Sequence, residues 1–216
     1  MEKIIVIGTG GHSAEIDDYF YFSSNHNSAF TSQIIGFIDD NPLGYDNYKF
    51  SAPFLGTITD HIIRNDCSYI MGIANLRYRR AIIEKFVQGG ANFTTFIHPT
   101  AIISPSAKIG VGVVIALHVN IGPNVTVGDF TLINSRSSVG HDTKIGTFNF
   151  ISPNVCFSGF TNIGEENLFG INSATIPGIS VGDRNKIMAG MTLDKSIGND
   201  ETIFYRFKEK VIAIPK

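Results

Sequence analysis

An apolar residue stands at every sixth position of the chain from Ile97 to Leu193. Of the 17 positions in this series, 16 are apolar and Thr175 is the exception. Such a period fits neither the 3.6-residue repeat of an α-helix nor the alternation of an ordinary strand. It indicates a hexapeptide β-helix, in which each flat side supplies one inward aliphatic residue and each corner needs a small or flexible one. A repetitive β-sandwich would need polar turns about 8 to 12 residues apart, and the sequence lacks them. Glycine often occupies the next position, as at Gly110, Gly122, Gly128, Gly140, Gly146, Gly164, Gly170 and Gly182.

The first 95 residues follow a different pattern, in which short apolar strands alternate with helices. The segments KIIVIG, SQIIGFIDD and SYIMGIAN are typical of buried parallel strands. Helical spacing appears in HSAEIDDYFYF and in LRYRRAIIEKFVQGG, where Gly89 and Gly90 end the second helix. This β-α-β order predicts a small α/β, doubly wound sheet that binds its ligand at the carboxyl ends of the strands. We therefore expect a Rossmann-like domain at residues 1–95 and a β-helix domain with a C-terminal tail at residues 96–216.

Composition and charge argue against several kinds of partner. The 216-residue chain has a formal net charge of -2, which gives no electrostatic basis for binding nucleic acid or an anionic membrane. Cys67 and Cys156 lack metal-type spacing, so we expect free thiols in a reducing compartment. No apolar run is long enough to span a membrane and no export signal is visible, so we expect a cytoplasmic protein. No metal site is expected, because His98, His118 and His141 are not separated by whole coils of the β-helix.

The segment GTGGHSAEI forms a glycine-rich loop between the first strand and the first helix. Gly8 permits the tight turn, while Gly10 and Gly11 let backbone N–H groups approach phosphate oxygens at the positive end of the helix. His12 is placed to donate a hydrogen bond to a phosphate or a sugar. Ser13 stands where a third glycine would allow the closest helix–sheet packing. The loop therefore predicts a diphosphate site, and the alternative is a purely structural turn whose histidine caps the helix.

The loop GTGGH, followed by FIHPTAIISPSAKIG and the long hexapeptide repeat, resembles the nucleotide-sugar N-acyltransferases. The resemblance implies a left-handed β-helix, a homotrimer, and acetyl-CoA in a groove between neighbouring β-helices. It implies that the N-terminal domain holds a nucleotide sugar carrying UDP, dTDP or GDP. The implied reaction is acetylation of the 4-amino group of a nucleotide-linked 4-amino-4,6-dideoxyhexose. The sialic acid O-acetyltransferases share this plan, so a sugar O-acetyltransferase and a non-catalytic sugar-nucleotide-binding trimer stay open as alternatives.

Further substrate-binding residues are expected at the ends of the second and third strands. Asp39 and Asp40 in FIDDN would face the nucleoside, where a carboxylate accepts the N–H of a base; the alternative is a pair of solvated loop acids. Gly72 and Asn75 in GIAN resemble the nucleotide-side residues of the family. Arg79 and Arg80 are expected on a solvated helix face.

The catalytic candidate is His141, which the segment GHDTKIG places beside a corner of the β-helix. Acetyl transfer to an amine needs a base, and imidazole titrates near the working pH. Asp142 can hold the ring in one tautomer only if the corner turns its side chain back, because consecutive strand residues point to opposite faces. The family motif is a histidine followed by an acid at this point, which this segment matches. The alternative is a histidine on the outer face of a coil.

Three residues are expected to contact acetyl-CoA. Gly159, one coil after His141, would offer its N–H to the thioester carbonyl, or is a plain corner glycine. Asn134 would orient the sugar or the pantetheine arm, or is an internal asparagine. Phe150 stands where relatives carry a second histidine near the acetyl group, which implies either a more apolar acetyl pocket or a pocket for another acyl group. The usual CoA-binding ending is replaced by a charged tail in which Arg206, Lys208 and Lys210 are candidate phosphate ligands.

Overall fold

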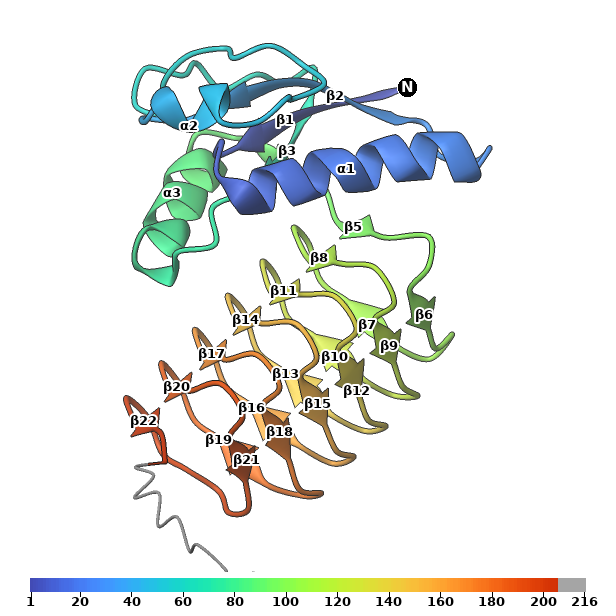
Figure 1. Ribbon diagram of the computed structural model, residues 1–216, viewed down its shortest axis with the longest axis vertical. Helices are drawn as coiled ribbons and strands as arrows, with labels where there is room; N and C mark the ends of the chain where they lie inside the picture. The colour runs from blue at the N-terminus through green and yellow to red at the C-terminus, as the bar shows by residue number, and fades with distance from the viewer. Residues whose placement is uncertain (206–216) are drawn as a thin grey trace, which may run out of the picture.

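The computed structural model describes residues 1–205, and it has an α/β N-terminal part packed on one end of a long parallel β-helix (Figure 1). A four-stranded parallel sheet in the order β2-β1-β3-β4 forms the N-terminal part. Its strands are β1 (Glu2–Ile7), β2 (Ser32–Ile38), β3 (Ser68–Met71) and β4 (Asn92–Phe93). The helices are α1 (Gly11–His26), the short α2 (Leu43–Asp46) and α3 (Leu76–Gln88). The expected Rossmann-like arrangement is confirmed, and β4 is a strand that the sequence pattern did not indicate.

The two faces of the sheet are buried by different helices because side chains alternate along β1. Ile4 and Val6 share one apolar cluster with Ile16 and Phe20 of α1. On the opposite face, Ile5 and Ile7 of β1 pack in a second cluster together with α3. Figure 1 shows α1 lying between the sheet and the β-helix. This helix is therefore covered on both sides.

The left-handed β-helix consists of strands of two residues each, stacked into three parallel sheets. The seven-stranded sheet contains β5 (Phe96–Ile97), β8 (Val114–Ile115), β11 (Leu132–Ile133), β14 (Phe150–Ile151), β17 (Leu168–Phe169), β20 (Lys186–Ile187) and β22 (Thr202–Ile203). The six-stranded sheet contains β6 (Ile102–Ile103), β9 (Asn120–Ile121), β12 (Ser138–Val139), β15 (Cys156–Phe157), β18 (Ala174–Thr175) and β21 (Thr192–Leu193). The five-stranded sheet contains β7 (Lys108–Ile109), β10 (Thr126–Val127), β13 (Lys144–Ile145), β16 (Asn162–Ile163) and β19 (Ser180–Val181).

The apolar series found in the sequence fills the interior of the β-helix. Residues such as Ile133, Val139 and Ile145 are at most 3% exposed and belong to one continuous core cluster. Thr175, the polar exception, is also inside, with 4% of its surface exposed. Ile97 departs from the expectation: it is 39% exposed, because it lies on the terminal strand of its sheet, where no further coil covers it.

The corners of the β-helix follow a different rule from the expected one. The glycine after each inward residue is needed for the stacking of coils: a Cβ on Gly128 would lie 2.6 Å from the carbonyl carbon of Gly146 in the next coil. The left-handed backbone conformation occurs two positions later, as at Phe130 (φ +57°) and Asp142 (φ +58°). The residues that adopt the left-handed conformation at the corners are thus mostly not glycine.

The last coil is shorter than the others. Strand partners in the preceding coils are 18 residues apart, as Leu168 and Lys186 are, whereas the N–H of Ser180 donates to the hydroxyl of Ser196, 16 residues further on. β20 pairs with β22 through Lys186 and Thr202. The period of six therefore stops after Leu193, and Ile197 and Ile203 continue the core at a changed spacing.

Candidate active site

A hollow of about 340 Å³ lies at the carboxyl ends of β1, β2 and β3. It is the place where an open α/β sheet binds its ligand. Six of the predicted substrate-binding residues border it, together with two residues of the loop after β3 and one of α3. The lining consists of Gly10, Gly11, His12, Asp39, Gly72, Ile73, Ala74, Asn75 and Tyr78.

The glycine loop turns in the way its sequence predicts. Gly8 has a φ of +113°, and a Cβ there would lie 2.9 Å from Cγ1 of Ile73. Gly10 faces open space within 4 Å. Ser13 is fully buried, and a Cβ on Gly72 would collide with its Oγ. Gly72 thus makes the room that a third glycine in the loop would otherwise provide.

His12 does not cap α1, whose N-cap is Gly10 without a side-chain hydrogen bond. Its Nδ1 lies 3.1 Å from Oε2 of Glu15, and the side chain is only 7% exposed. The other ring nitrogen, Nε2, is buried and has no partner among the residues that the structure describes. A buried polar atom without a partner, beside the first turn of a 16-residue helix, is open to a polar group of a ligand; with Nδ1 donating to Glu15, Nε2 accepts a hydrogen bond in the neutral ring and donates one only in the doubly protonated ring.

The two aspartates after β2 have different surroundings. Asp39 accepts hydrogen bonds from the N–H of Thr9 (2.7 Å), the hydroxyl of Thr9 (3.0 Å) and the N–H of Asn41 (2.8 Å). It borders the hollow but also holds the glycine loop in place. Asp40 accepts from the N–H and hydroxyl of Thr59, and it is not among the residues that line this hollow.

Other residues near the hollow were missed or assigned differently from the sequence. Asn75 is the N-cap of α3, where its side chain accepts from the N–H of Arg77. The hydroxyl of Tyr48 lies over Gly11, 3.1 Å from where a Cβ would stand. Tyr48 comes from a loop without a recognisable motif, so no sequence signal pointed to it.

Arg79 was predicted on a solvated helix face, and this is wrong. The side chain is 1% exposed, and its guanidinium donates to the carbonyls of Ile73 (3.3 Å) and Phe130 (3.0 Å). Burial lowers the pKa of Arg79 to about 10. The prediction failed because α3 is covered by a corner of the β-helix, which the helical pattern cannot reveal. Arg80, in contrast, has 41% of its side chain exposed and pairs with Glu84 and Glu166.

His141 lies at the corner between β12 and β13, with its side chain 55% exposed. Its Nδ1 donates to Oδ2 of Asp142 over 2.9 Å, because a carboxylate only accepts. The left-handed backbone of Asp142 turns its side chain back toward the ring, and its N–H donates to the carbonyl of Pro123. The hydrogen bond from His141, with a second from Asn124, lowers the pKa of the Asp142 carboxyl. Because Nδ1 donates to Asp142, Nε2 is the ring nitrogen that can accept a proton.

Gly159 lies directly against the His141 ring. A Cβ on Gly159 would be 2.8 Å from Cε1 and 2.9 Å from Nε2 of His141. The aromatic ring of Phe160 stands at 89° to the imidazole with a centroid separation of 5.0 Å. Among the described residues, the N–H of Gly159 has no acceptor. The corner thus combines a free base with a free backbone donor.

The two remaining acetyl-CoA candidates lie apart from this corner. Asn134 is 8% exposed, and its side-chain oxygen accepts from the N–H of Ser135. Phe150 belongs to β14 in the seven-stranded sheet and packs partly against the cluster that includes α1. Because His141 follows β12 in the six-stranded sheet, the chain does not place Phe150 and His141 on the same side of the β-helix. Arg206, Lys208 and Lys210 lie outside the described residues.

Residues 3–86 match the family described as PglD N-terminal domain. We call this part of the chain the PglD-type domain after that match. The curated relative UDP-N-acetylbacillosamine N-acetyltransferase from Bacillus subtilis is 26% identical over 117 residues, which is 53% of this chain. The match spans about half the length of that relative (51%). The resemblance to nucleotide-sugar N-acyltransferases is thereby confirmed, with a PglD-type domain at the N-terminus.

Solved structures resemble the chain over almost its full length, so the similarity extends over both the N-terminal part and the β-helix. The acetyltransferase domain of PglB from Neisseria gonorrhoeae, in complex with acetyl coenzyme A, is 28% identical with a TM-score of 0.82 and covers 93% of this chain and 95% of its own. PerB from Caulobacter crescentus, in complex with CoA and GDP-perosamine, is 22% identical with a TM-score of 0.78 and covers 94% of this chain and 93% of its own.

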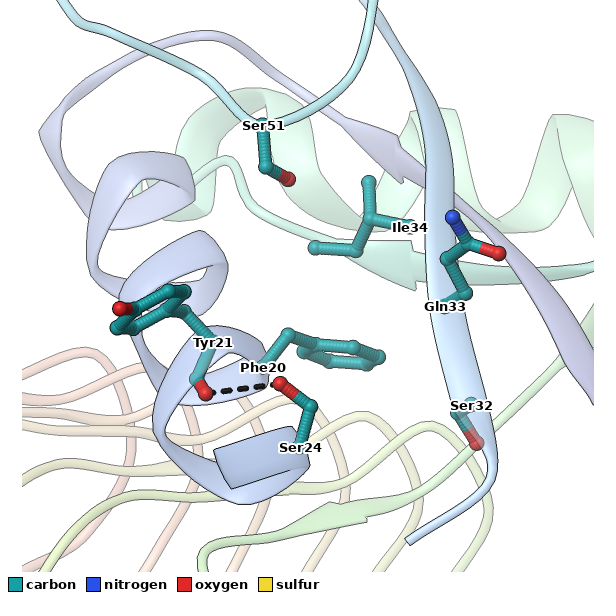
Figure 2. A pocket seen from close by; sticks show the side chains of 7 residues that line it. All are labelled: Phe20, Tyr21, Ser24, Ser32, Gln33, Ile34 and Ser51. Carbon is teal, nitrogen blue, oxygen red and sulfur yellow. Dashed lines mark hydrogen bonds between the residues drawn. The ribbon is translucent and has the colours of Figure 1, made fainter. Parts of the chain in front are cut away.

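Three further observations describe the surroundings of the site. A smaller hollow of about 200 Å³ lies between α1 and β2, as Figure 2 shows, and none of the predicted site residues lines it. Its serines are occupied locally, as in the bond from Ser24 Oγ to the carbonyl of Tyr21. Within residues 1–205 no group of three histidine, cysteine or acidic side chains is arranged to hold a metal ion. No helix in the same range is long and apolar enough to cross a bilayer.

Proposed function

We propose that the protein is an acetyl-CoA-dependent N-acetyltransferase that acts on the 4-amino group of a nucleotide-linked 4-amino-4,6-dideoxy sugar. The observation that carries the proposal is the His141 corner. An imidazole held in one tautomer by Asp142 has its Nε2 free beside the unpaired N–H of Gly159. Related structures bind acetyl coenzyme A or CoA, and one also binds GDP-perosamine.

The reaction follows from the groups at this corner. Nε2 of His141 accepts the proton of the amine as its nitrogen attacks the thioester carbonyl. The C–N bond forms, the C–S bond breaks, and the CoA thiolate leaves with the proton that His141 has taken up. The thioester oxygen carries a negative charge in the tetrahedral intermediate, and the N–H of Gly159 donates a hydrogen bond to it there. Loss of one such donor typically lowers the rate about 10²- to 10³-fold.

The hollow of the PglD-type domain is the proposed nucleotide-sugar site. The first turn of α1 and the open space beside Gly10 offer backbone donors to a diphosphate, and the buried Nε2 of His12 is available for one further polar contact with the ligand. Asp39 and Asn75 border the hollow at the sides where the nucleoside and sugar would lie. UDP, dTDP and GDP are the candidate carriers.

A trimer is part of the proposal. Phe150 lies in β14 of the seven-stranded sheet, whereas His141 lies at the corner between β12 and β13. An acetyl pocket bordered by both would form between copies, with Asn134 near the same boundary. Analytical ultracentrifugation of the purified chain tests this assembly, and a monomer at working concentration would contradict it.

The deciding experiment compares the wild-type protein with His141→Asn. We expect acetyl transfer to one member of a panel of UDP-, dTDP- and GDP-linked 4-amino-4,6-dideoxy sugars. In the variant, kcat falls by about 10² or more, while calorimetry shows unchanged binding of the nucleotide sugar and of acetyl-CoA. A near-normal rate in the variant removes the proposed mechanism. Turnover of only hydroxyl acceptors identifies an O-acetyltransferase instead, and binding without turnover identifies a non-catalytic binding protein.

A further inference from the structure

The one polar residue of the inward apolar series lies next to the proposed catalytic corner. Thr175 is in β18, which stacks on β15, the strand immediately before Ser158 and Gly159. It is 4% exposed and stands where every other coil has an apolar side chain. A buried hydroxyl in an apolar column is stabilising only when it is hydrogen-bonded.

Thr175 interrupts the backbone pairing between these two coils. One coil earlier, the N–H of Gly140 donates to the carbonyl of Phe157 over 2.8 Å. At the equivalent place, the N–H of Ser158 donates to Oγ1 of Thr175 (3.1 Å). Ser158 Oγ donates to the Thr175 carbonyl over 2.7 Å. Two hydroxyl groups have therefore replaced one backbone hydrogen bond.

The hydrogen bonds around Ser158 can be assigned donors and acceptors in one consistent way. Thr161 Oγ1 donates to the carbonyl of Ser158 over 2.7 Å. Since this uses the only proton of Thr161, the 3.1 Å contact between the two threonine hydroxyls is donated by Thr175. The hydroxyl of Thr143 is a second donor to the Ser158 carbonyl, over 3.2 Å. Thr143 and Thr161 are fully buried.

These bonds act on the peptide group that contains the N–H of Gly159. The carbonyl of Ser158 and the N–H of Gly159 belong to one conjugated unit. Hydroxyl donors at the carbonyl draw electron density from the nitrogen, and hydrogen bonds in a chain strengthen one another. The N–H of Gly159 becomes a stronger donor and is held in a fixed direction beside His141.

We propose that Thr175 is a positioning residue for acetyl transfer: through Thr161 it orients and polarises the Ser158–Gly159 peptide, whose N–H binds the thioester oxygen. The inference rests on the proposed function, and it adds a determinant of the rate that does not touch either substrate. Thr175 would act on the transition state more than on binding, because the charge on that oxygen is largest there.

The test uses Thr175→Val, which removes the hydroxyl and keeps the shape, and Thr175→Ser, which restores it. Thr161→Val breaks the next link of the chain and serves if Thr175→Val does not fold. Thr131→Val is the matched control, because Thr131 is a fully buried threonine that accepts the N–H of Asn149 and donates to a corner carbonyl away from His141. Each variant is assayed for kcat, both KM values and thermal stability. The infrared carbonyl band of bound acetyl-CoA labelled with ¹³C at the thioester carbon reports the strength of the donor directly.

We expect Thr175→Val to lower kcat about tenfold with both KM values unchanged, a smaller effect than losing the donor itself. The carbonyl band should move to higher frequency, and Thr175→Ser should recover both properties. The inference is overturned if the wild-type protein is active and Thr175→Val has the same kcat and the same band frequency. It is also overturned if Thr131→Val changes kcat and the band frequency as much as Thr175→Val does. If the wild-type protein binds acetyl-CoA but acetylates no amine, the proposed acceptor is wrong. The frequency of the carbonyl band in wild type and Thr175→Val then still tests whether Thr175 strengthens the donor. Failure to bind acetyl-CoA at all would overturn both proposals.

Discussion

The contact between His141 and Gly159 shows why a glycine is needed one coil below the imidazole. The ring lies where the first side-chain atom of any other residue would be. Asp142 holds the ring from the other side, and its left-handed backbone is what brings the carboxylate back to the corner. The sequence predicted the pair from its motif, but the position of the ring over Gly159 depends on stacking that only the folded coils define.

We therefore predict that Gly159→Ala displaces the His141 ring and lowers kcat about 10²-fold, because a misplaced base or reactant loses the oriented geometry. Steady-state kinetics and a thermal melt measure the effect. Gly198→Ala is the control, since a Cβ there meets only Oε1 of Glu201 at 3.1 Å. An equal loss of activity in both variants would contradict the assigned contact.

The coil is the element that the sequence predicted best. A side chain pointing inward every six residues leaves few alternative folds, so sheets and core followed from the pattern. The left-handed corner positions did not, because they are occupied by residues as different as Phe148, Asn154 and Arg184, and no shared property marks them. Thr175 was visible as an exception, but its partners Ser158 and Thr161 are set by the stacking of coils.

A column of buried asparagines is a second feature of the coils. Asn149, Asn167 and Asn185 are at most 1% exposed and lie one coil apart. The side-chain oxygen of each one accepts a backbone N–H of the next coil, and Asn167 also donates to Asn149. These bonds satisfy backbone groups that the turn leaves without a ladder partner.

We predict that Asn167→Ala lowers the free energy of unfolding by about 1–3 kcal/mol, the cost of leaving buried polar groups unpaired. Chemical denaturation measures the change. Asn162→Ala, at an exposed position on β16, should stay within about 0.5 kcal/mol of the wild type. Comparable losses in the two variants would show that the column does not contribute to stability.

At the scale of the whole molecule, the PglD-type domain and the β-helix are joined by shared packing and by one buried cation. Tyr19 and Phe20 of α1 are in one cluster with Phe96 and Leu132 of the β-helix. Arg79 connects the carbonyl of Ile73, beside the hollow of the PglD-type domain, to a β-helix corner. The sequence predicted both halves and the glycine loop. It did not predict their contact, because contacts between distant segments leave no periodic signal.

We predict that Arg79→Ala destabilises the protein by about 3 kcal/mol, since it leaves a cavity and two carbonyls without their donor. The melting temperature should fall clearly. Arg80→Ala removes a partly exposed guanidinium that pairs with Glu166 of the β-helix, and it should cost no more than about 1 kcal/mol. Equal falls in melting temperature would show that the buried guanidinium of Arg79 contributes no more than this surface ion pair.

The double role of α1 limits how the chain can be taken apart. Phe96, Val114 and Leu132 are at most 4% exposed and share an apolar cluster with α1. A recombinant fragment that began at the first coil would therefore display an aromatic and aliphatic stripe to water, and such stripes promote aggregation. Chimaeras that exchange nucleotide-binding halves between enzymes of this shape must either carry residues 11–26 with the coils or replace the stripe with polar side chains.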